Sequence, residues 1–405
     1  MRRIMVFTFT RAEYGLLKPV LRKIEASPAL EMVLVVAGDH FNAHKGRTIE
    51  EIESDGFRIS AVIDHFTHTG DREDTIEALA LTTKRIGELL SEYQPQLIVL
   101  LGDRYELLTA ATCAVVCRVP VAHIAGGEST EGVLDEQVRH AITKISHLHF
   151  PATRRYGWNT RLLGEEAWRI HVVGSPGVEN ITRGDYMSAD ELQAAFGIDA
   201  RLPTMLITFH PETLVMDSPA RQMNELVAAL RCFADYQQII THPGAESGSQ
   251  AIIDVWRDYA AANSNVVVHP SLGSRGYLGV MKTAKAVVGN SSSGIIEAPS
   301  LRVPTINIGA RQKGRVRADS VIDVEARAPE IMAALRRALN DPAFLRSLKE
   351  VVNPYDPYQD GNVGGRIVAA LEIVPLDQRL MEKRLDFPGS AEEEKYFGRE
   401  GFSNC

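Results

Sequence analysis

The hydrophobic positions of the chain form short continuous runs that alternate with longer segments of mixed character. Residues 97–101, Leu-Ile-Val-Leu-Leu, contain no polar position, and such runs are typical of strands buried on both faces of a parallel sheet. The runs predict two series of strands. The first covers residues 4–9, 32–37, 97–101, 119–124, 147–150 and 170–173, and the second covers residues 204–209, 238–241, 266–269, 286–288 and 304–307.

The segments between these runs have the periodicity of amphipathic helices. Clear examples are residues 72–92, 105–117, 218–233 and 250–263. Strands that alternate with helices indicate βαβ units, and each series has the size of one Rossmann domain. We therefore predict an α/β protein with two doubly wound parallel sheets facing a central cleft. The boundary between the domains is expected near residues 174–177 or within residues 182–190.

Polar residues gather at the ends of the predicted strands. In open α/β sheets, ligands bind beyond the carboxyl ends of the strands, so these positions are candidates for a site. In the first half they are residues 10–15, 102–106 and 123–128, and in the second half residues 210–212, 242–244 and 289–294.

The segment Val288 to Glu297 leads from a strand through Gly-Asn-Ser-Ser-Ser-Gly into a predicted helix near Gly294. Backbone N–H groups at the start of a helix can hold a phosphate, and Ser291 and Ser292 add hydroxyl donors. Glu297, expected in the first helical turn, can accept hydrogen bonds from both hydroxyls of a ribose. The alternative is a simple capping box without a ligand.

Residues 311–317, Arg-Gln-Lys-Gly-Arg-Val-Arg, place four cations beyond the next strand. Neighbouring cations repel one another and need solvent or an anion. A solvated surface is the ordinary explanation of a charge run. Because this loop is expected at the same sheet edge as the serines, a diphosphate ligand is the better interpretation.

Carboxylates dominate the strand ends of the first half. Asp103 and Glu128 follow predicted strands, and Asp135 opens a helix in which Arg139 lies one turn further on. Asp135 and Arg139 alone would be a surface ion pair. Three acids near one sheet edge are suited to removing and returning a proton.

The histidines differ in their expected tasks. His210 and His242 each end a strand of the second half and are candidates for the site, whereas His147 and His149 alternate along a strand and are expected in the sheet. His40, His44, His65 and His68 lie in polar segments without the spacing of metal ligands. The absence of a Cys/His cluster and of a GxGxxG motif argues against a metal ion and a dinucleotide cofactor.

Composition narrows the classes of function. The 44 basic and 52 acidic side chains give a formal net charge of −8 without a basic block, which argues against nucleic acid and anionic membranes as partners. The first apolar run ends at Arg11 and resembles neither a signal peptide nor an anchor. Four cysteines without a CxxC pair indicate a reduced, cytoplasmic protein.

Taken together, these motifs resemble the hydrolysing UDP-N-acetylglucosamine 2-epimerases of bacterial sialic and legionaminic acid synthesis. The resemblance covers nearly the whole chain. It rests on Thr-Arg-Ala-Glu-Tyr-Gly-Leu-Leu at 10–17, Gly-Asp-Arg-Tyr-Glu at 102–106, His-Ile-x-Gly-Gly-Glu at 123–128, Asp-Glu-x-x-Arg-His-x-Ile-Thr-Lys at 135–144, Phe-His-Pro-Glu-Thr at 209–213, Gly-Asn-Ser-Ser-Ser-Gly at 289–294 and Asn-Ile-Gly-x-Arg-Gln-Lys-Gly-Arg at 307–315.

The resemblance implies a GT-B-like fold, with an N-terminal domain at 1–178, a UDP-binding domain at 179–362 and, at 363–405, a helix that packs back on the first domain and a tail. The implied reaction removes UDP and the C2 proton to give a glycal, which then takes up water. The products would be UDP and N-acetylmannosamine. No cofactor is implied, and the protein is expected to be a homodimer or homotetramer.

The resemblance also implies roles for individual residues. The catalytic candidates are Asp103, Glu128, Asp135 and His210, and the candidates for binding the UDP-sugar are Arg11, Arg139, His242, Ser274, Ser291, Ser292, Glu297 and Arg311. Many relatives have a glutamate where this chain has Ala125, so Glu128, or else Glu131, would supply that acid. Many also have a lysine in place of Leu16, and Lys18 is the nearest cation here.

Several alternatives remain open. A UDP- or GDP-linked 2,4-diacetamido-trideoxy sugar could replace UDP-N-acetylglucosamine, because the two substrates require only different pocket shapes. A glycosyltransferase of the same fold would use the same nucleotide cradle together with an acceptor site. A non-hydrolysing epimerase would release UDP-N-acetylmannosamine, and a sugar-nucleotide-binding regulator would bind UDP without turnover.

Overall fold

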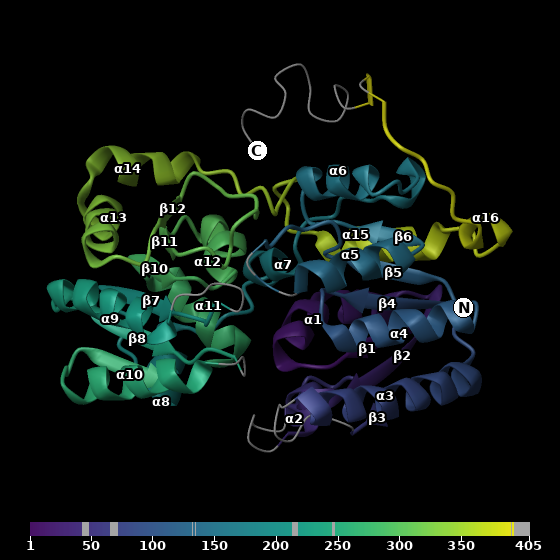
Figure 1. The fold of residues 1–405 in the computed structure, drawn as a ribbon, viewed down its shortest axis with the longest axis horizontal. Helices are drawn as coiled ribbons and strands as arrows, with labels where there is room; N and C mark the ends of the chain where they lie inside the picture. Colours follow the sequence, from purple (N-terminus) through teal and green to yellow (C-terminus); the bar gives the residue numbers. More distant parts are fainter. Residues whose placement is uncertain are drawn as a thin grey trace. The chain divides into compact units, whose positions relative to one another are not determined.

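The computed structural model describes residues 1–42, 48–64, 72–131, 133, 135–212, 218–244, 248–389, 391 and 392. The chain forms two compact units (Figure 1). Unit 1 contains Met1–Glu128, Asp135–Glu179 and Asp360–Cys405, and unit 2 contains Ser129–Leu134 and Asn180–Gln359.

Unit 1 is built on a six-stranded parallel sheet in the order β3-β2-β1-β4-β5-β6. Its strands are β1 (Arg2–Thr8), β2 (Leu30–Ala37), β3 (Ile59–Ile63), β4 (Leu97–Leu101), β5 (Val121–Ile124) and β6 (Leu148–Phe150). Its helices are α1 (Arg11–Ala26), α2 (Ile49–Ser54), α3 (Arg72–Tyr93), α4 (Tyr105–Val116), α5 (Asp135–Ile145), α6 (Arg154–Leu162), α15 (Val363–Ile373) and α16 (Gln378–Met381), and α7 (Pro176–Thr182) spans the passage into unit 2.

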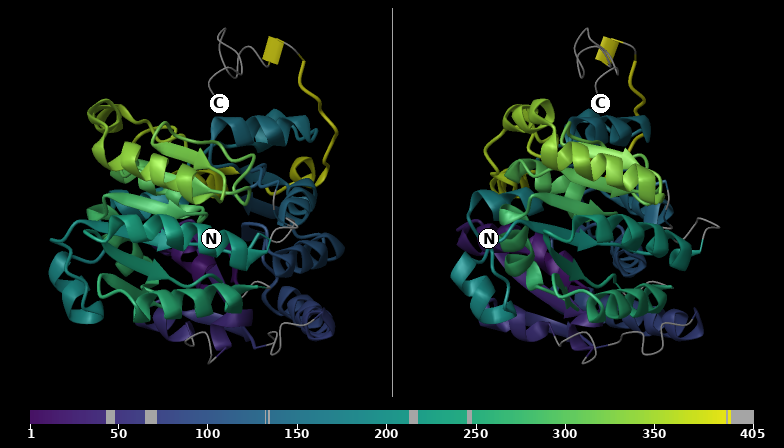
Figure 2. Two further views of the ribbon diagram at one scale, coloured as in Figure 1. Left: turned by 60° about the vertical axis from the view of Figure 1, so that its left-hand side comes forward. Right: turned by 90° about the vertical axis from the view of Figure 1, so that its left-hand side faces the viewer.

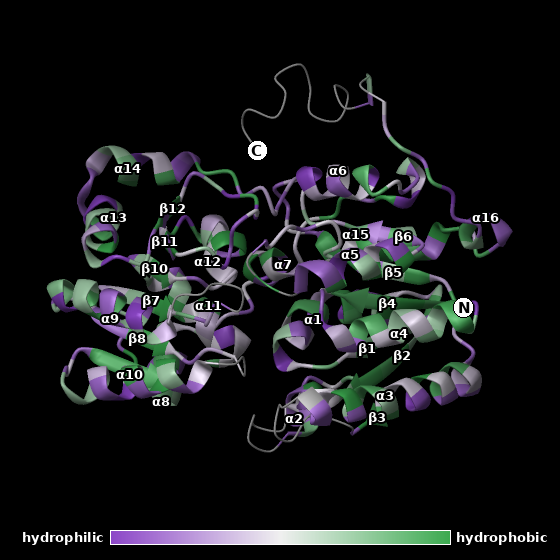
Figure 3. Cartoon of the chain, in the orientation of Figure 1, coloured by the Kyte–Doolittle hydropathy of each residue, from purple (hydrophilic) through white to green (hydrophobic). Residues whose placement is uncertain are grey.

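Alternate side chains of β1 enter two separate hydrophobic clusters. Ile4 and Val6 face the cluster that α1 and α15 cover, whereas Met5 and Phe7 face the cluster that α3 and α4 cover. Both faces of the sheet are therefore buried, which explains the continuous apolar runs and the green strands of Figure 3.

Unit 2 repeats this architecture with the strand order β12-β11-β10-β7-β8-β9. The strands are β7 (Thr204–Thr208), β8 (Gln237–Thr241), β9 (Val266–His269), β10 (Ala286–Gly289), β11 (Thr305–Ile308) and β12 (Val321–Val324). The helices are α8 (Ala189–Phe196), α9 (Pro219–Leu230), α10 (Ser249–Ala261), α11 (Gly273–Thr283), α12 (Ser293–Ile296), α13 (Ala328–Asn340) and α14 (Pro342–Ser347). Helices lie on both faces of this sheet (Figure 2). Hydrophobic clusters fill both sides of it.

The predicted α/β class with two doubly wound parallel sheets is confirmed. The strand predicted at residues 170–173 is wrong, because Ile170 makes only an isolated bridge to His149. Strands β3 and β12 were not predicted, since these edge strands carry polar or exposed positions that break the apolar run. None of the helices in the described part of the chain has the length and hydropathy of a bilayer span.

Candidate active site

Asp103 lies directly after β4, at the carboxyl edge of the first sheet. Gly102 precedes it with φ +95°, a conformation that glycine adopts most readily. The carbonyl oxygen of Gly102 lies 2.7 Å from Nε2 of His123, a fully buried residue of the neighbouring strand β5. Burial lowers the pKa of His123 to about 4, so the imidazole is neutral at pH 7. The two strand ends therefore fix the backbone that carries Asp103.

Arg139 connects the polar residues of this edge. Its guanidinium is 1% exposed and forms an ion pair with the carboxylate of Asp103. It also donates hydrogen bonds to a carboxylate oxygen of Glu136 (2.6 Å) and to the carbonyl oxygen of Glu128 (3.2 Å). A buried charge requires such partners. Arg139 thus has a positioning task, and its contact with a substrate stays a prediction.

The three predicted acids differ in exposure. The Glu128 side chain is buried, Asp103 is partly buried, and Asp135 is exposed as the first residue of α5. Glu136 was not assigned a role from the sequence, although it bonds both Arg139 and Nε2 of His140 (3.0 Å). Its i,i+3 spacing from Arg139 was the signal that could have identified it.

The end of β1 contributes Arg11 and a second unassigned acid. Arg11 is the first residue of α1, and Thr10 caps this helix by accepting a hydrogen bond from the Glu13 N–H group. Glu13 is 5% exposed, and its Oε2 accepts a hydrogen bond from the Phe9 N–H group (3.0 Å). Burial raises the pKa of Glu13 to about 8, so this carboxyl is mostly protonated at pH 7.

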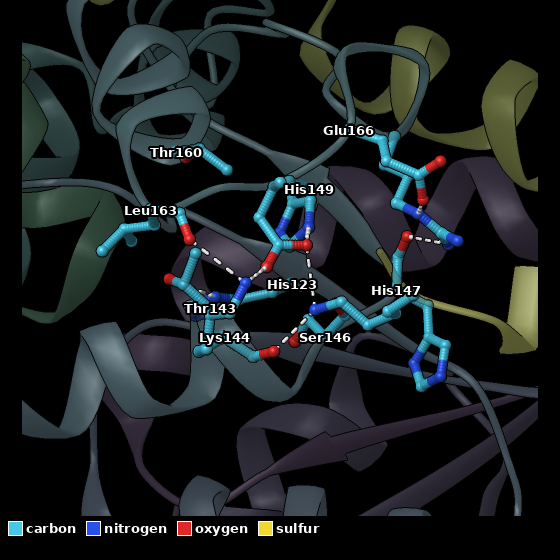
Figure 4. A network of polar contacts seen from close by, with 12 residues as sticks. His123, Thr143, Lys144, Ser146, His147, His149, Thr160, Leu163 and Glu166 are labelled. Carbon is cyan, nitrogen blue, oxygen red and sulfur yellow. Dashed lines mark hydrogen bonds and ion pairs between the residues drawn. The ribbon is translucent and has the colours of Figure 1, made fainter. Parts of the chain in front are cut away.

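His149 lies on β6 and His147 directly before it, and both are buried, as predicted for residues of the sheet. Glu165, which is 1% exposed, bonds His149 (2.9 Å), Lys144 (2.5 Å) and Lys383 (2.8 Å) (Figure 4). The nearby cations and His149 lower the pKa of Glu165 to about 2 despite its burial. This cluster ties the C-terminal segment to the end of α5.

His40 was expected in a polar loop, but it is buried and has a structural role. It is fully buried and bonds the hydroxyl groups of Thr8 (3.0 Å) and Thr48 (2.8 Å). His44, His65 and His68 lie outside the described residues.

In unit 2, His210 follows β7 and is held by the loop after the neighbouring strand β10. Asn290, which follows β10 and is fully buried, accepts a hydrogen bond from the His210 N–H group through Oδ1 (2.7 Å) and donates one from Nδ2 to the His210 carbonyl oxygen (2.9 Å). Nδ1 of His210 accepts a hydrogen bond from Gly244 N–H (3.4 Å). The loop after β10 therefore fixes the backbone of His210, and the loop after β8 contacts its imidazole ring.

The serine loop differs from its predicted form. Helix α12 is only four residues long, and Ser292 makes no side-chain capping bond, so neither an extended helix dipole nor a capping box is present. Glu297 follows this helix instead of lying in its first turn, and its side chain is 7% exposed. Ser291 and Ser292 are partly buried, and the nearby Tyr277 hydroxyl bonds the hydroxyl of Thr208 on β7 (3.2 Å). The loop offers hydroxyl and backbone donors to a ligand.

The cationic loop is also less open than predicted. Lys313 forms an ion pair with Glu131 (3.0 Å), and Arg317 forms one with Asp323 (2.8 Å). Arg315 donates to Oε1 of Gln312 (2.7 Å). Lys313 and Arg317 are thus paired with acids within unit 2, and Arg311 stays the candidate for an anion contact.

His242 and Ser274 belong to different elements of unit 2. His242 follows β8 and its N–H group donates to the carbonyl oxygen of His269 (3.3 Å); partial burial lowers the pKa of His242. Ser274 is the second residue of α11, the helix that also carries Tyr277. Their contacts with a ligand stay predictions.

Comparison with known proteins identifies the family. The sequence model of the UDP-N-acetylglucosamine 2-epimerase family matches residues 22–372. The chain is 32% identical over 382 residues to the UDP-N,N'-diacetylbacillosamine 2-epimerase (hydrolyzing) of Legionella pneumophila, covering 94% of this chain and 98% of that protein. It is 35% identical to the polysialic acid biosynthesis protein P7 of Escherichia coli over 359 residues, covering 88% and 90%.

Solved structures share the fold. The UDP complex of Staphylococcus aureus MnaA superposes with a TM-score of 0.76 at 15% identity and covers 96% of this chain and 100% of that one. The UDP-GlcNAc 2-epimerase of Neisseria meningitidis bound to UDP-GlcNAc gives 0.76 at 16% identity, with coverages of 92% and 99%. With the family match across most of its length, the chain belongs to the UDP-N-acetylglucosamine 2-epimerase family.

Proposed function

We propose that this protein is a hydrolysing 2-epimerase that converts UDP-N-acetylglucosamine and water into N-acetylmannosamine and UDP, in nonulosonic (sialic) acid synthesis. The observation that carries the proposal is the ion-paired carboxylate of Asp103, fixed by buried Arg139 at the carboxyl edge of the first sheet. An ionised acid held at a strand end is suited to remove a proton from a bound sugar. The relative from Legionella pneumophila is named as hydrolyzing, which supports the loss of UDP.

The first step of the proposed reaction is an elimination. The bond between C1 and the diphosphate oxygen breaks, and its electron pair leaves with UDP. Asp103 takes the C2 proton, and the C2–H electrons form the C1=C2 double bond of a glycal. Arg311 and the hydroxyl groups of Ser291 and Ser292 would stabilise the negative charge that develops on UDP.

The second step is hydration of the glycal. Water adds its hydroxyl to C1, and a proton reaches C2 from the face opposite to the one it left, which inverts that carbon. A second acid is needed for this return. Asp135 and Glu128 are the candidates, and they belong to the helix and the strand end that Arg139 joins to Asp103.

A 2,4-diacetamido-trideoxy sugar nucleotide is the second candidate substrate. The names of the relatives favour it, because the Legionella pneumophila protein is a UDP-N,N'-diacetylbacillosamine 2-epimerase, and a Campylobacter jejuni protein at 34% identity over 325 residues is named for the GDP- and UDP-linked forms. The chemistry at C1 and C2 is the same for both sugars.

Product analysis in D2O tests these proposals together. The purified protein is incubated with each sugar nucleotide without an acceptor, and products are followed by NMR. The hydrolysing mechanism predicts UDP and an unlinked 2-epimeric sugar with deuterium at C2. A UDP-linked epimer would indicate the non-hydrolysing reaction, and the absence of turnover without an acceptor would favour a glycosyltransferase. The substrate with the larger kcat/KM identifies the sugar.

A further inference from the structure

Three loops at the carboxyl edge of the second sheet form a closed ring of hydrogen bonds. They follow β7, β10 and β11, which are adjacent in the sheet. The loop after β7 carries His210 and Glu212, the loop after β10 carries Asn290, and the loop after β11 carries Arg311. Each loop thus depends on the other two for its conformation.

Glu212 joins the first loop to the third. Its Oε1 accepts hydrogen bonds from the backbone N–H groups of Ala310 (2.7 Å) and Arg311 (3.1 Å), and its Oε2 accepts one from Nε2 of Gln222 on α9 (3.1 Å). The residue is 8% exposed. Three donors face one side chain, so the position requires a group that only accepts, which among side chains is a carboxylate.

Gly309 makes this approach possible. It has φ +79°, and a Cβ atom at this position would overlap Oε1 of Glu212. Glycine is therefore required both by the backbone conformation and by the close approach of the carboxylate. The backbone of Gly309, Ala310 and Arg311 therefore packs closely against the Glu212 carboxylate.

Asn290 closes the ring on the other side. Its side chain holds the His210 backbone through two hydrogen bonds. Its own carbonyl oxygen accepts hydrogen bonds from a guanidinium nitrogen of Arg311 (3.2 Å) and from Nε2 of Gln312 (2.8 Å), and Gln312 is 2% exposed. The Arg311 backbone is thus held by Glu212, and its guanidinium is directed toward the loop after β10.

We propose that Glu212 is a positioning residue that acts through Arg311, holding the turn after β11 so that the Arg311 guanidinium is oriented to bind the diphosphate of the UDP-sugar. The inference deepens the proposed function and rests on it, because the diphosphate is that of the proposed substrate. Glu212 itself touches backbone and Gln222, so its effect on the ligand is indirect.

A double-mutant cycle on UDP affinity tests this coupling, with the dissociation constant of UDP measured by calorimetry. Glu212→Ala is expected to weaken UDP binding about tenfold in the wild-type background, since it removes charge-assisted hydrogen bonds that order the loop. In the Arg311→Met background the same change is expected to have an effect below about twofold, because residues in one network are not additive.

Gly309→Ala provides a second route to the same disruption. The added Cβ displaces the Glu212 carboxylate without removing it, so this variant is expected to show the same loss and the same dependence on Arg311. Glu212→Gln, which keeps an acceptor oxygen, is expected to recover part of the affinity.

Glu225→Ala is the matched control. Glu225 lies on α9 of the same unit and accepts a hydrogen bond from the Ala328 backbone N–H group (2.7 Å). The substitution therefore removes a comparable hydrogen bond and is expected to leave UDP affinity unchanged. Equal effects of Glu212→Ala in both Arg311 backgrounds would overturn the inference and leave the proposed function intact. Wild-type protein that does not bind UDP would overturn both. Coupled UDP binding without turnover of sugar nucleotides would support the inference and reject the proposed reaction.

Discussion

Arg139 shows how a single buried cation organises the candidate acids. Its guanidinium bonds Asp103, Glu136 and the backbone of Glu128, so it connects the loops after β4 and β5 with helix α5. The surrounding anions offset the desolvation of the guanidinium. The same contacts keep Asp103 in one orientation, which is what a base needs to reach a C–H bond.

Asp103→Asn is expected to retain UDP binding while turnover falls by about 100-fold or more, because an amide keeps the shape of the side chain but cannot accept the C2 proton. UDP affinity by calorimetry and sugar release by NMR measure the two properties separately. Asp199→Asn is the control, since Asp199 forms an ion pair with Arg201 on the surface of unit 2. Near-normal turnover of the Asp103 variant would remove this residue from the chemistry.

At the scale of residues, the sequence was sufficient to locate candidate site residues whose place depends only on where a strand ends. Asp103, Glu128, His210 and Ser291 all follow strands, as predicted. The protonation of Glu13 could not be predicted, because it depends on burial among residues distant in the chain. The burial of His40 was missed for the same reason.

At the scale of elements, the tip of the second sheet depends on Gly289. This last residue of β10 has φ +129°, and a Cβ atom here would overlap the Thr208 carbonyl oxygen of β7. Strand β10 can therefore pair with β7 up to its end only with glycine at this position. The loop that carries Asn290 and the serines starts at the next residue, so the close contact at Gly289 sets the position of its first residue.

Gly289→Ala is expected to lower the free energy of unfolding by about 3 kcal/mol or more, because it combines backbone strain with a steric overlap inside a sheet. Gly184→Ala is the control. Gly184 has φ +73° with open space around its Cβ position, so strain alone should cost about 1 kcal/mol. Urea denaturation of both variants measures the difference, and equal losses would show that the overlap with Thr208 is relieved elsewhere.

The lengths of elements were harder to predict than their order. The helix expected near Gly294 ends after four residues, because Pro299 shortly afterwards favours a short 3-10 segment, Ala298–Leu301. The segment Ile-His-Val-Val at residues 170–173 satisfied the pattern of a strand, yet sheet pairing is a tertiary property that local pattern does not determine.

At the scale of the whole molecule, several buried histidines make stability depend on pH. Burial lowers the pKa values of His40, His123 and His147 to about 4. Between pH 6.5 and 4 the unfolded chain therefore binds more protons at these sites than the folded chain, so they favour unfolding as the pH falls. Glu13, whose pKa is raised to about 8, acts in the opposite direction above pH 4.5. Three histidines outweigh this one acid.

The free energy of unfolding is thus expected to decrease as the pH is lowered from 6.5 to 4, by up to about 3 kcal/mol per pH unit near pH 5. Urea denaturation at a series of pH values measures this slope. His147→Asn is expected to make it shallower, since asparagine offers an acceptor for the Val121 N–H group that His147 Nδ1 now bonds (3.2 Å) but does not titrate. A slope unchanged by this substitution would contradict the assignment.

Unit 1 takes its core from both ends of the sequence. Val363, Ile367 and Leu371 of α15 are buried in the same cluster as Leu17 and Val20 of α1. During synthesis the ribosome makes these late residues only after all of unit 2. Until α15 has been made, part of one apolar face of the first sheet stays uncovered. A product terminated before α15 would expose that face to chaperones, proteases and other nascent chains.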